Sequence, residues 1–345
     1  MTDPTDVTDP SPSAHGPSAN GETWPPVPDL PPVEAPSAGF IVQLFVIPAV
    51  VVFVVILVWL LFGKLAGGER DAMEYVRLIR ASSSNWRAAN RAAFELASLI
   101  QNDPRLAADP RLVGELTDLL QHDLDKVENP ELTEYVALAL GQFHTLDAVT
   151  ASGKKVDPLA ALARAVQGSY PLNIRVAAAK SLAQHAARDE GRLDDADAVA
   201  ALAEAGKSGE PPLRQVCTFA LGFFGGAAAE KALHEQLAND DRDTRYNAAV
   251  ALARRADPAA LAILREMLSS ADLDRRLEGT PPSEKPARIE ALELEVLNAL
   301  HNSVSASKLD LARQLRPEID ALTHSSLVAV RNNAQALLRR VPPHK

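Results

Sequence analysis

The chain has 345 residues, of which 47% are hydrophobic and 5% aromatic, and its formal net charge is −10. The low aromatic content argues against a β-sandwich or β-barrel, and a single cysteine, Cys217, excludes a disulfide framework and Cys-rich metal sites. The acidic balance argues against a nucleic-acid-binding protein, because neutralising phosphates requires an excess of Lys and Arg.

Residues 1–38 form an acidic, proline-rich segment. They contain six Asp or Glu residues and ten prolines, and they contain no Lys or Arg. A segment with so few apolar side chains cannot offset the conformational entropy that is lost on ordering. The sequence therefore predicts a disordered N-terminal tail.

Residues 40–62 form an apolar run without a single charge, FIVQLFVIPAVVVFVVILVWLLF. As an α-helix of ~1.5 Å per residue, this run would be about 34 Å long and could cross a hydrocarbon core of ~30 Å. The sequence predicts one transmembrane helix over residues 39–63. The chain would contact the lipid bilayer through residues 40–62.

Basic residues flank this run on one side only. Lys64, Arg70, Arg77 and Arg80 follow it within about 20 residues, whereas no Lys or Arg precedes it. The positive-inside rule then predicts a single-pass protein of the cell membrane, with the N-terminus outside and the remainder in the cytoplasm.

The sequence after Gly68 contains an internal repeat. An arginine is followed by mostly small residues three and four positions later and by leucine seven positions later, and these offsets lie on one helix face. The arginines are Arg175, Arg214, Arg245 and Arg331, and copies without the arginine start at Ala89, Thr133 and Glu293. Successive copies start 31 to 48 residues apart, which leaves room for a second helix in each interval. These helices are expected at 69–80, 109–124, 157–167, 195–206, 227–238, 258–270 and 306–322, so we predict about seven antiparallel pairs.

Helix-start signals support this pattern. At four of the expected helix starts an Asp or Asn residue directly precedes a proline, which suits an N-cap followed by proline at the first helical position. They are Asp109, Asn129, Asp157 and Asp257. Asn173 and Asp243 lie two residues before Arg175 and Arg245, where they could cap those helices. Glycines at 225 and 226 are expected to end the helix that contains Phe223.

Three segments resemble HEAT repeats, a family of armadillo-like α-solenoids. They are IRVAAAKSLA at 174–183, residues 240–268, and VRNNAQALL at 330–338. The resemblance covers about residues 70–340 and implies an all-α fold, a right-handed α-α superhelical solenoid over 69–341, with 342–345 as a C-terminal tail. It also implies a structural ladder, in which aligned arginines contact acidic turn residues. Arg175, Arg214, Arg245 and Arg331 occupy the arginine position, and Asp243 is the expected acidic partner.

The sequence shows little catalytic chemistry. The eight histidines are scattered without a recognised ligand spacing, and no glycine-rich phosphate-binding loop is present. His234-Glu235 is the only His-Glu pair, whereas the HEAT-like di-iron hydroxylases resemble arrays of several such pairs. Cys217 occupies a small-residue core position and is expected to be a buried, inert thiol. We therefore expect no catalytic, metal or cofactor-binding residues and no enzymatic activity.

Two features favour contact with a partner. Phe219 and Phe223 are expected on the helix face opposite Cys217, where they form a candidate apolar contact for another protein. The alternative is that both rings pack on the adjacent repeat. Residues 271–286 are expected to form a long loop that either joins the binding face or is simply disordered.

Together these features predict a membrane-tethered scaffold that binds another protein through a cytoplasmic solenoid, without catalysis. One alternative is a HEAT-like lyase or an accessory subunit of an enzyme. Another is a spacer of the cell envelope that associates with itself, and the sequence leaves a homo-oligomer open. The Ala- and Arg-rich composition suggests a bacterial source.

Overall fold

The computed structural model describes residues 52–56, 72–81, 85–305 and 308–342. The chain divides into two units, residues 1–68 and residues 69–345. In the first unit the described residues, 52–56, are helical and exposed. The predicted tail and most of the predicted transmembrane segment lie outside the described residues. Among the helices that are described, none is both long enough and apolar enough to span a bilayer.

The described part of the second unit contains seven pairs of helices. The main first helices are α3 (Ala72–Ala81), α6 (Pro110–Asp125), α8 (Pro158–Val166), α10 (Ala196–Ala205), α12 (Gly226–Gln236), α14 (Leu261–Met267) and α18 (Arg316–Leu322). The second helices are α4 (Trp86–Asn102), α7 (Pro130–Leu140), α9 (Leu172–Arg188), α11 (Pro211–Leu221), α13 (Arg242–Arg254), α16 (Lys285–Ser305) and α19 (Val328–Arg340). Short additional helices are α5 (Pro104–Ala107), the 3-10 helix η2 (Pro258–Ala260), α15 (Ser270–Arg276) and α17 (Asp310–Gln314).

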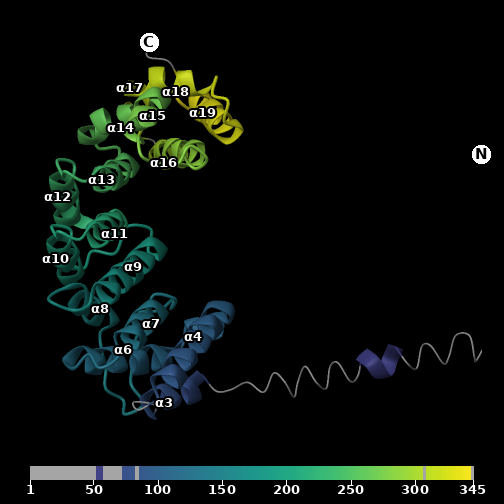
Figure 1. The fold of residues 1–345 in the computed structure, drawn as a ribbon, viewed down its shortest axis with the longest axis vertical. Coiled ribbons are helices and arrows are strands. Elements are labelled where there is room, and N and C mark those ends of the chain that lie inside the picture. The colour runs from purple at the N-terminus through teal and green to yellow at the C-terminus, as the bar shows by residue number, and fades with distance from the viewer. Residues whose placement is uncertain (1–51, 57–71, 82–84, 306–307, 343–345) are drawn as a thin grey trace, which may run out of the picture. The chain divides into compact units, whose positions relative to one another are not determined.

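The pairs stack in sequence order. Each first helix packs against its second helix, and the second helices form a continuous row from α4 through α7, α9, α11, α13 and α16 to α19. Figure 1 shows the second unit as an arc, with α9, α11, α13 and α16 on its inner side and α8, α10, α12 and α14 on its outer side. The prediction of an all-α, solenoid-like fold is confirmed for the described residues.

The repeated sequence pattern forms the core. In α9, Ala178, Ala179 and Leu182 follow Arg175 at offsets three, four and seven, and all three are fully buried. The equivalent residues of α13 are buried in the same way. Small side chains at the two middle positions allow neighbouring helices to approach closely, and burial of each leucine contributes roughly 2 kcal/mol. The expected helices 109–124, 157–167 and 195–206 agree with α6, α8 and α10 to within one residue.

Most of the predicted N-caps are confirmed. The side chains of Asp109, Asn129, Asp157 and Asp257 each accept a hydrogen bond from a backbone N–H two or three residues later. The predicted caps at Asn173 and Asp243 are wrong. Helix α9 already begins at Leu172, directly after a proline, and α13 is capped by Asp241. Both residues therefore lie within the first turn.

The predicted end of α11 is also wrong. The helix ends at Leu221, with Gly222 as its C-cap, so Phe223 lies beyond the helix. A Cβ atom at position 222 would approach the Ala251 Cβ of α13 to 2.8 Å. Glycine at this position permits the close packing of α11 on α13, and this tertiary contact is not visible in the local sequence.

Half of the expected loop 271–286 is helical, because residues 271–276 belong to α15 and residues 285–286 belong to α16. Helix α15 begins after Ser269, whose side chain accepts a hydrogen bond from the Asp272 backbone, and α16 begins at Lys285. Leu273 and Leu277 are buried, at 0% and 2% exposure. Burial of these two leucines stabilises a helical turn in a segment whose composition resembles a linker.

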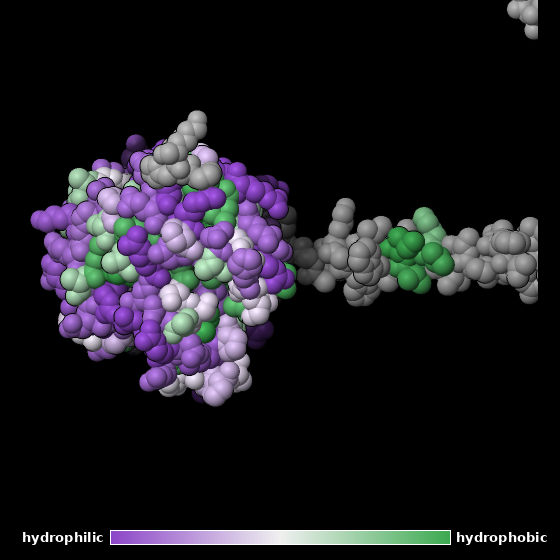
Figure 2. Space-filling model, turned by 90° about the horizontal axis from the view of Figure 1, so that it is seen from above, coloured by the Kyte–Doolittle hydropathy of each residue, from purple (hydrophilic) through white to green (hydrophobic). Residues whose placement is uncertain are grey.

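The C-terminal end of the stack presents a mostly hydrophilic surface. Figure 2 views the molecule from this end, and the hydrophobic residues on the visible face form small, separate areas. In α19, Val330, Ala334 and Leu337 are fully buried, whereas Arg339 and Arg340 are exposed. Helix α19 is therefore amphipathic, with its apolar face packed against α16 and α18.

Candidate binding surfaces

The four aligned arginines share one structural environment. Each donates a hydrogen bond to a backbone carbonyl at or just after the end of the first helix in its own pair. The donor–acceptor pairs are Arg175 Nε–Val166 O at 2.9 Å, Arg214 Nη1–Ser208 O at 2.8 Å, Arg245 Nη1–Asn239 O at 2.7 Å and Arg331 Nη1–Ser325 O at 2.5 Å. The Val166 carbonyl is the last one of α8, and the other three belong to the turn between the two helices of a pair, so that none has an intrahelical partner. The arginines therefore fix the angle between the two helices of a pair.

The expected acidic partner of this ladder, Asp243, makes different contacts. Its carboxylate lies 3.4 Å from Arg242 and 3.4 Å from Arg288. The acidic residue near the ladder is instead Asp241, whose Oδ1 lies 3.9 Å from Arg214 Nη2. Because Asp241 is the N-cap of α13, it links the turn of one repeat to the arginine of the preceding repeat.

The two predicted contact phenylalanines lie together on the inner row of helices. Phe219 is 39% exposed, and Phe223 is half-buried. Their ring centroids are 4.9 Å apart in an edge-to-face arrangement, and the guanidinium carbon of Arg254 lies 4.9 Å from the Phe223 ring centroid. Phe223 therefore packs partly against α13 of the next repeat, whereas Phe219 remains available to solvent.

A polar pair extends this cluster. Burial lowers the pKa of Arg254, while burial raises the pKa of Glu295, with the charge of Arg254 opposing the latter shift. The aromatic pair of Phe219 and Phe223 thus lies beside Arg254 of α13, whose charge acts on Glu295 of α16. Such a combination is typical of protein-binding surfaces.

A shallow groove lies between the second helices α7, α9 and α11. It has a volume of about 520 Å³, an apolar lining and a charged residue of each sign. The apolar lining residues are Leu138, Leu172, Val176, Ala177 and Pro212, and the charged ones are Glu134 and Lys180. Glu134 is held in place by a 2.7 Å hydrogen bond from the Asn173 amide. The groove could accommodate apolar side chains of another protein.

A more enclosed pocket of about 540 Å³ lies between the first two helix pairs. Helices α3, α4, α6 and α7 contribute to it, and Trp86, His122 and Asp123 are among its lining residues. Burial raises the pKa of Asp123 to about 6. The sequence reasoning missed this pocket. One local signal was available, because Asp123 and Asp125 lie in the last turn of α6, where the helix dipole disfavours carboxylates.

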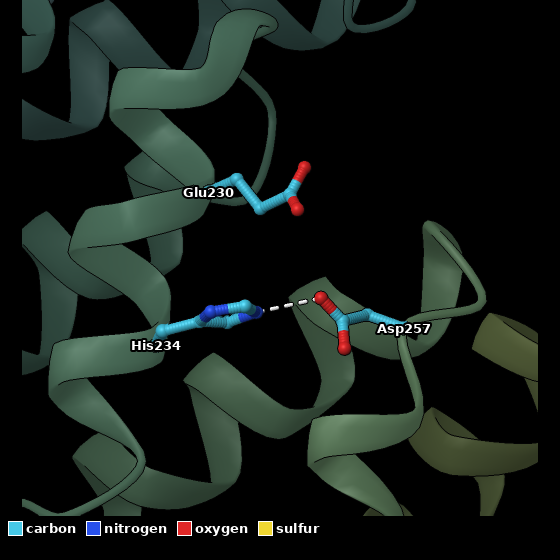
Figure 3. A group of neighbouring side chains, drawn as sticks. All are labelled: Glu230, His234 and Asp257. Atoms are coloured by element: carbon cyan, nitrogen blue, oxygen red, sulfur yellow. Dashed lines mark hydrogen bonds and ion pairs between the residues drawn. The ribbon is translucent and has the colours of Figure 1, made fainter.

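A third group combines residues of α12 and the turn before η2. Figure 3 shows Glu230 and His234, one turn apart on α12, pointing towards Asp257. His234 Nε2 lies 2.6 Å from Asp257 Oδ2, and the possible ligand atoms of the three residues lie within 4.8 Å of one another. A nitrogen donor with two carboxylates suits a divalent transition metal. However, the positive charge of Arg255 acts on both carboxylates, and the His234–Asp257 hydrogen bond accounts for the arrangement without a metal.

Cys217 behaves as expected from the sequence. Its side chain is fully buried, and burial raises the pKa of its thiol to about 12. The thiolate, which is the reactive form, is therefore not populated near neutral pH.

Comparisons with known proteins bear on the repeats. Residues 199–279 match the family model for HEAT repeats. This stretch extends from α10 to α15 and includes the whole of the resembling segment 240–268. The HEAT resemblance is thus confirmed for the central repeats. No curated protein matches the chain.

Two solved structures are similar to the chain at low identity. One is a chain from the structure of the Pds5-Scc1 complex, with 14% identity and a TM-score of 0.39 over 81% of this chain and 42% of that chain. This chain therefore spans less than half of that protein. The other is human deoxyhypusine hydroxylase in complex with glycerol, with 17% identity and a TM-score of 0.29 over 79% of this chain and 99% of that chain.

Proposed function

We propose that the chain is a scaffold that binds another protein through the inner face of its HEAT-like array, without catalysing a reaction. The array would be tethered to the cell membrane by residues 40–62, with the N-terminus outside and the repeats in the cytoplasm. The tether rests on the uncharged 23-residue run and on the basic residues that follow it.

The observation that carries the binding proposal is the exposed apolar strip along the second helices. The groove residues Leu172 and Val176 and the ring of Phe219 lie on α9 and α11, on the inner side of the arc. Leu172 and Phe219 are 36% and 39% exposed. Exposed apolar groups with charged residues beside them mark surfaces that bind other proteins.

A photo-crosslinking experiment in native cells tests this proposal. A benzophenone side chain is introduced into the full-length protein at Val176, in the groove, or at the exposed Ala200 of α10, on the outer row. We expect one abundant crosslinked protein from position 176 and at least fivefold less of it from position 200. Equal yields from both positions would contradict a specific inner surface.

A matched pair of substitutions then separates binding from folding. Phe219→Asp places a charge in the exposed strip, and Leu146→Asp does the same at an equally exposed leucine in the loop after α7. We expect F219D to reduce crosslinking from position 176 at least fivefold and L146D to leave it unchanged, with equal melting temperatures. A crosslinked partner that is a second copy of the chain would instead support the self-associating spacer.

A further inference from the structure

The pocket between the first two helix pairs contains a carboxylate that lacks a partner. Asp123 Oδ2 is buried and makes no hydrogen bond. Neighbouring carboxylates around the pocket are each paired with a cation. The pairs are Asp118–Arg80 at 3.0 Å, Asp125–Arg164 at 2.7 Å and Glu128–Lys126 at 2.6 Å. Asp123 is therefore the lining carboxylate for which the structure shows no ion pair, and its Oδ2 atom has no hydrogen bond.

Leaving a carboxylate in this state is unfavourable. A buried polar atom without a hydrogen bond loses its hydration without forming a contact that replaces it. The resulting free-energy cost is largest for charged groups. Burial is the main cause of the raised pKa of Asp123, and Glu128 raises it further, whereas His122 and Arg80 act in the opposite direction. A cation beside Asp123 would remove this penalty.

The remaining pocket chemistry also suits a cation. Trp86, which is 51% exposed, lines the same pocket, and indole is the aromatic ring that attracts cations most strongly. The guanidinium of Arg87 already lies 5.0 Å from the Trp86 ring centroid. Four carboxylates line the pocket together with Arg80, His122 and Lys126, so that acidic side chains outnumber basic ones in its lining.

We propose that this pocket binds a guanidinium or ammonium group, which forms an ion pair with Asp123 and contacts the indole of Trp86. The volume of about 540 Å³ is within the range of small-ligand sites. The group could belong to an arginine or lysine side chain of a polypeptide or to a free cation, because both carry the same chemistry. The pocket lies apart from the inner-face groove, and the proposal does not depend on the proposed scaffold function.

Fluorescence titration of the full-length protein in detergent tests this proposal. Trp24 and Trp59 are replaced by Phe, so that Trp86 is the remaining indole among the three tryptophans of the chain. The probe is Nα-acetyl-arginine N-methylamide at pH 7.5, and the matched neutral probe is the corresponding citrulline derivative. We expect saturable binding of the arginine probe and at least tenfold weaker binding of the citrulline probe.

Variants identify the carboxylate. Asp123→Asn keeps the shape but removes the charge, and we expect it to weaken binding of the arginine probe at least tenfold. Asp147→Asn, at an exposed position in the loop after α7, serves as the control and should leave the affinity unchanged. Equal binding of the two probes, or an unchanged affinity in D123N, would overturn the proposal and leave a water-filled cavity.

Two further measurements complete the test. The melting temperature of D123N without ligand should equal or exceed that of the wild type, because the substitution removes an unpaired charge. A lower melting temperature would show that the charge of Asp123 stabilises the fold, contrary to the proposal. Agmatine distinguishes the two sources of the cationic group. Tighter binding of agmatine than of Nα-acetyl-arginine N-methylamide supports a free cation, and weaker binding supports a side chain of a polypeptide.

Discussion

Arginine side chains donate hydrogen bonds to backbone carbonyls at the ends of helices and in the turns that follow them. The guanidinium of Arg245 donates from Nη1 to the carbonyls of Asn239 and Asp240, at 2.7 and 2.9 Å. At the opposite ends of the second helices, Arg188 donates to the Gly141 and Phe143 carbonyls, and Arg255 donates to the Phe224 carbonyl. Single residues thus fix both the angle within a pair and the spacing between pairs.

Removing one such arginine should destabilise the fold measurably. Arg245→Ala leaves two carbonyls at the end of α12 without their charged donor, and we expect the free energy of unfolding to fall by about 2 kcal/mol. Urea denaturation measures this change. Arg275→Ala is the matched control, because Arg275 is exposed and contacts Asp272 one turn away, so the change should stay below ~0.5 kcal/mol. Equal losses in both variants would contradict the role assigned to Arg245.

His185 should make stability dependent on pH. Its Nε2 lies 3.0 Å from the Leu140 carbonyl, and burial, together with the charge of Arg188 and a smaller effect of His144, lowers its pKa from 6.5 to about 4. The unfolded chain therefore takes up a proton first as the pH falls. The wild type should lose about 3 kcal/mol between pH 6.5 and pH 4 relative to a chain without this group.

The comparison is with His185→Gln, whose amide can donate to the same carbonyl but does not titrate. Urea denaturation of both proteins at intervals between pH 4 and 7 gives the difference in unfolding free energy. That difference should change in favour of the variant as the pH falls through this window. A constant difference would mean that His185 has the same pKa in the folded and the unfolded chain, so that burial does not lower it.

Residue roles could be predicted from the sequence where they depend on neighbours along the chain. Asp109 and Asp157 were recognisable as caps because the following proline marks the first helical position. Asp123 could be suspected only from its unfavourable place in the last turn of α6. Its lack of a partner depends on where Arg80 and Arg164 lie, and these residues come from other helices.

At the scale of elements, close contacts between backbones decide several positions. Gly114 of α6 faces the loop that follows α7, and a Cβ atom there would lie 2.7 Å from the Thr150 nitrogen and would also overlap the Val149 carbonyl. A 3.0 Å hydrogen bond from the Val149 N–H to the Pro110 carbonyl holds this loop on α6. Glycine is therefore required at position 114 by the close packing of the loop on α6, and not by an unusual backbone conformation.

Gly114→Ala tests this view against helix propensity. Propensity alone would stabilise α6 by ~1 kcal/mol, whereas the overlap with a backbone should destabilise it by about 1 to 3 kcal/mol. We expect a net loss in thermal or urea unfolding. Gly209→Ala is the control, because no atom lies near its added Cβ, and this variant should be at least as stable as the wild type. A stabilised G114A protein would contradict the observed packing.

The existence of the helices was easier to predict than their ends. Periodicity identified α6, α8 and α10 almost to the residue, because their apolar faces repeat regularly. The end of α11 at Gly222 and the helix α15 were missed, since the first depends on Ala251 of another helix and the second on the burial of Leu273. Such contacts across the fold override the local composition.

At the scale of the whole molecule, the proposed membrane topology makes a direct prediction. A cysteine introduced at Ser18 should react with an impermeant maleimide on intact cells, and one introduced at the exposed Ser283 should react only after permeabilisation. The wild-type chain is the control, because its thiol is fully buried. Labelling of the cysteine at position 283 in intact cells, with protection at position 18, would reverse the proposed orientation.

The ordered contacts of the second helices, from α4 to α19, also have a mechanical consequence. Each pair touches chiefly the pair before it and the pair after it, so a force applied to the two ends would be transmitted through every intervening interface. Small rotations at each interface would add up to a large change in the distance between the ends. The array would then behave as a spring whose resting length depends on what is bound along it.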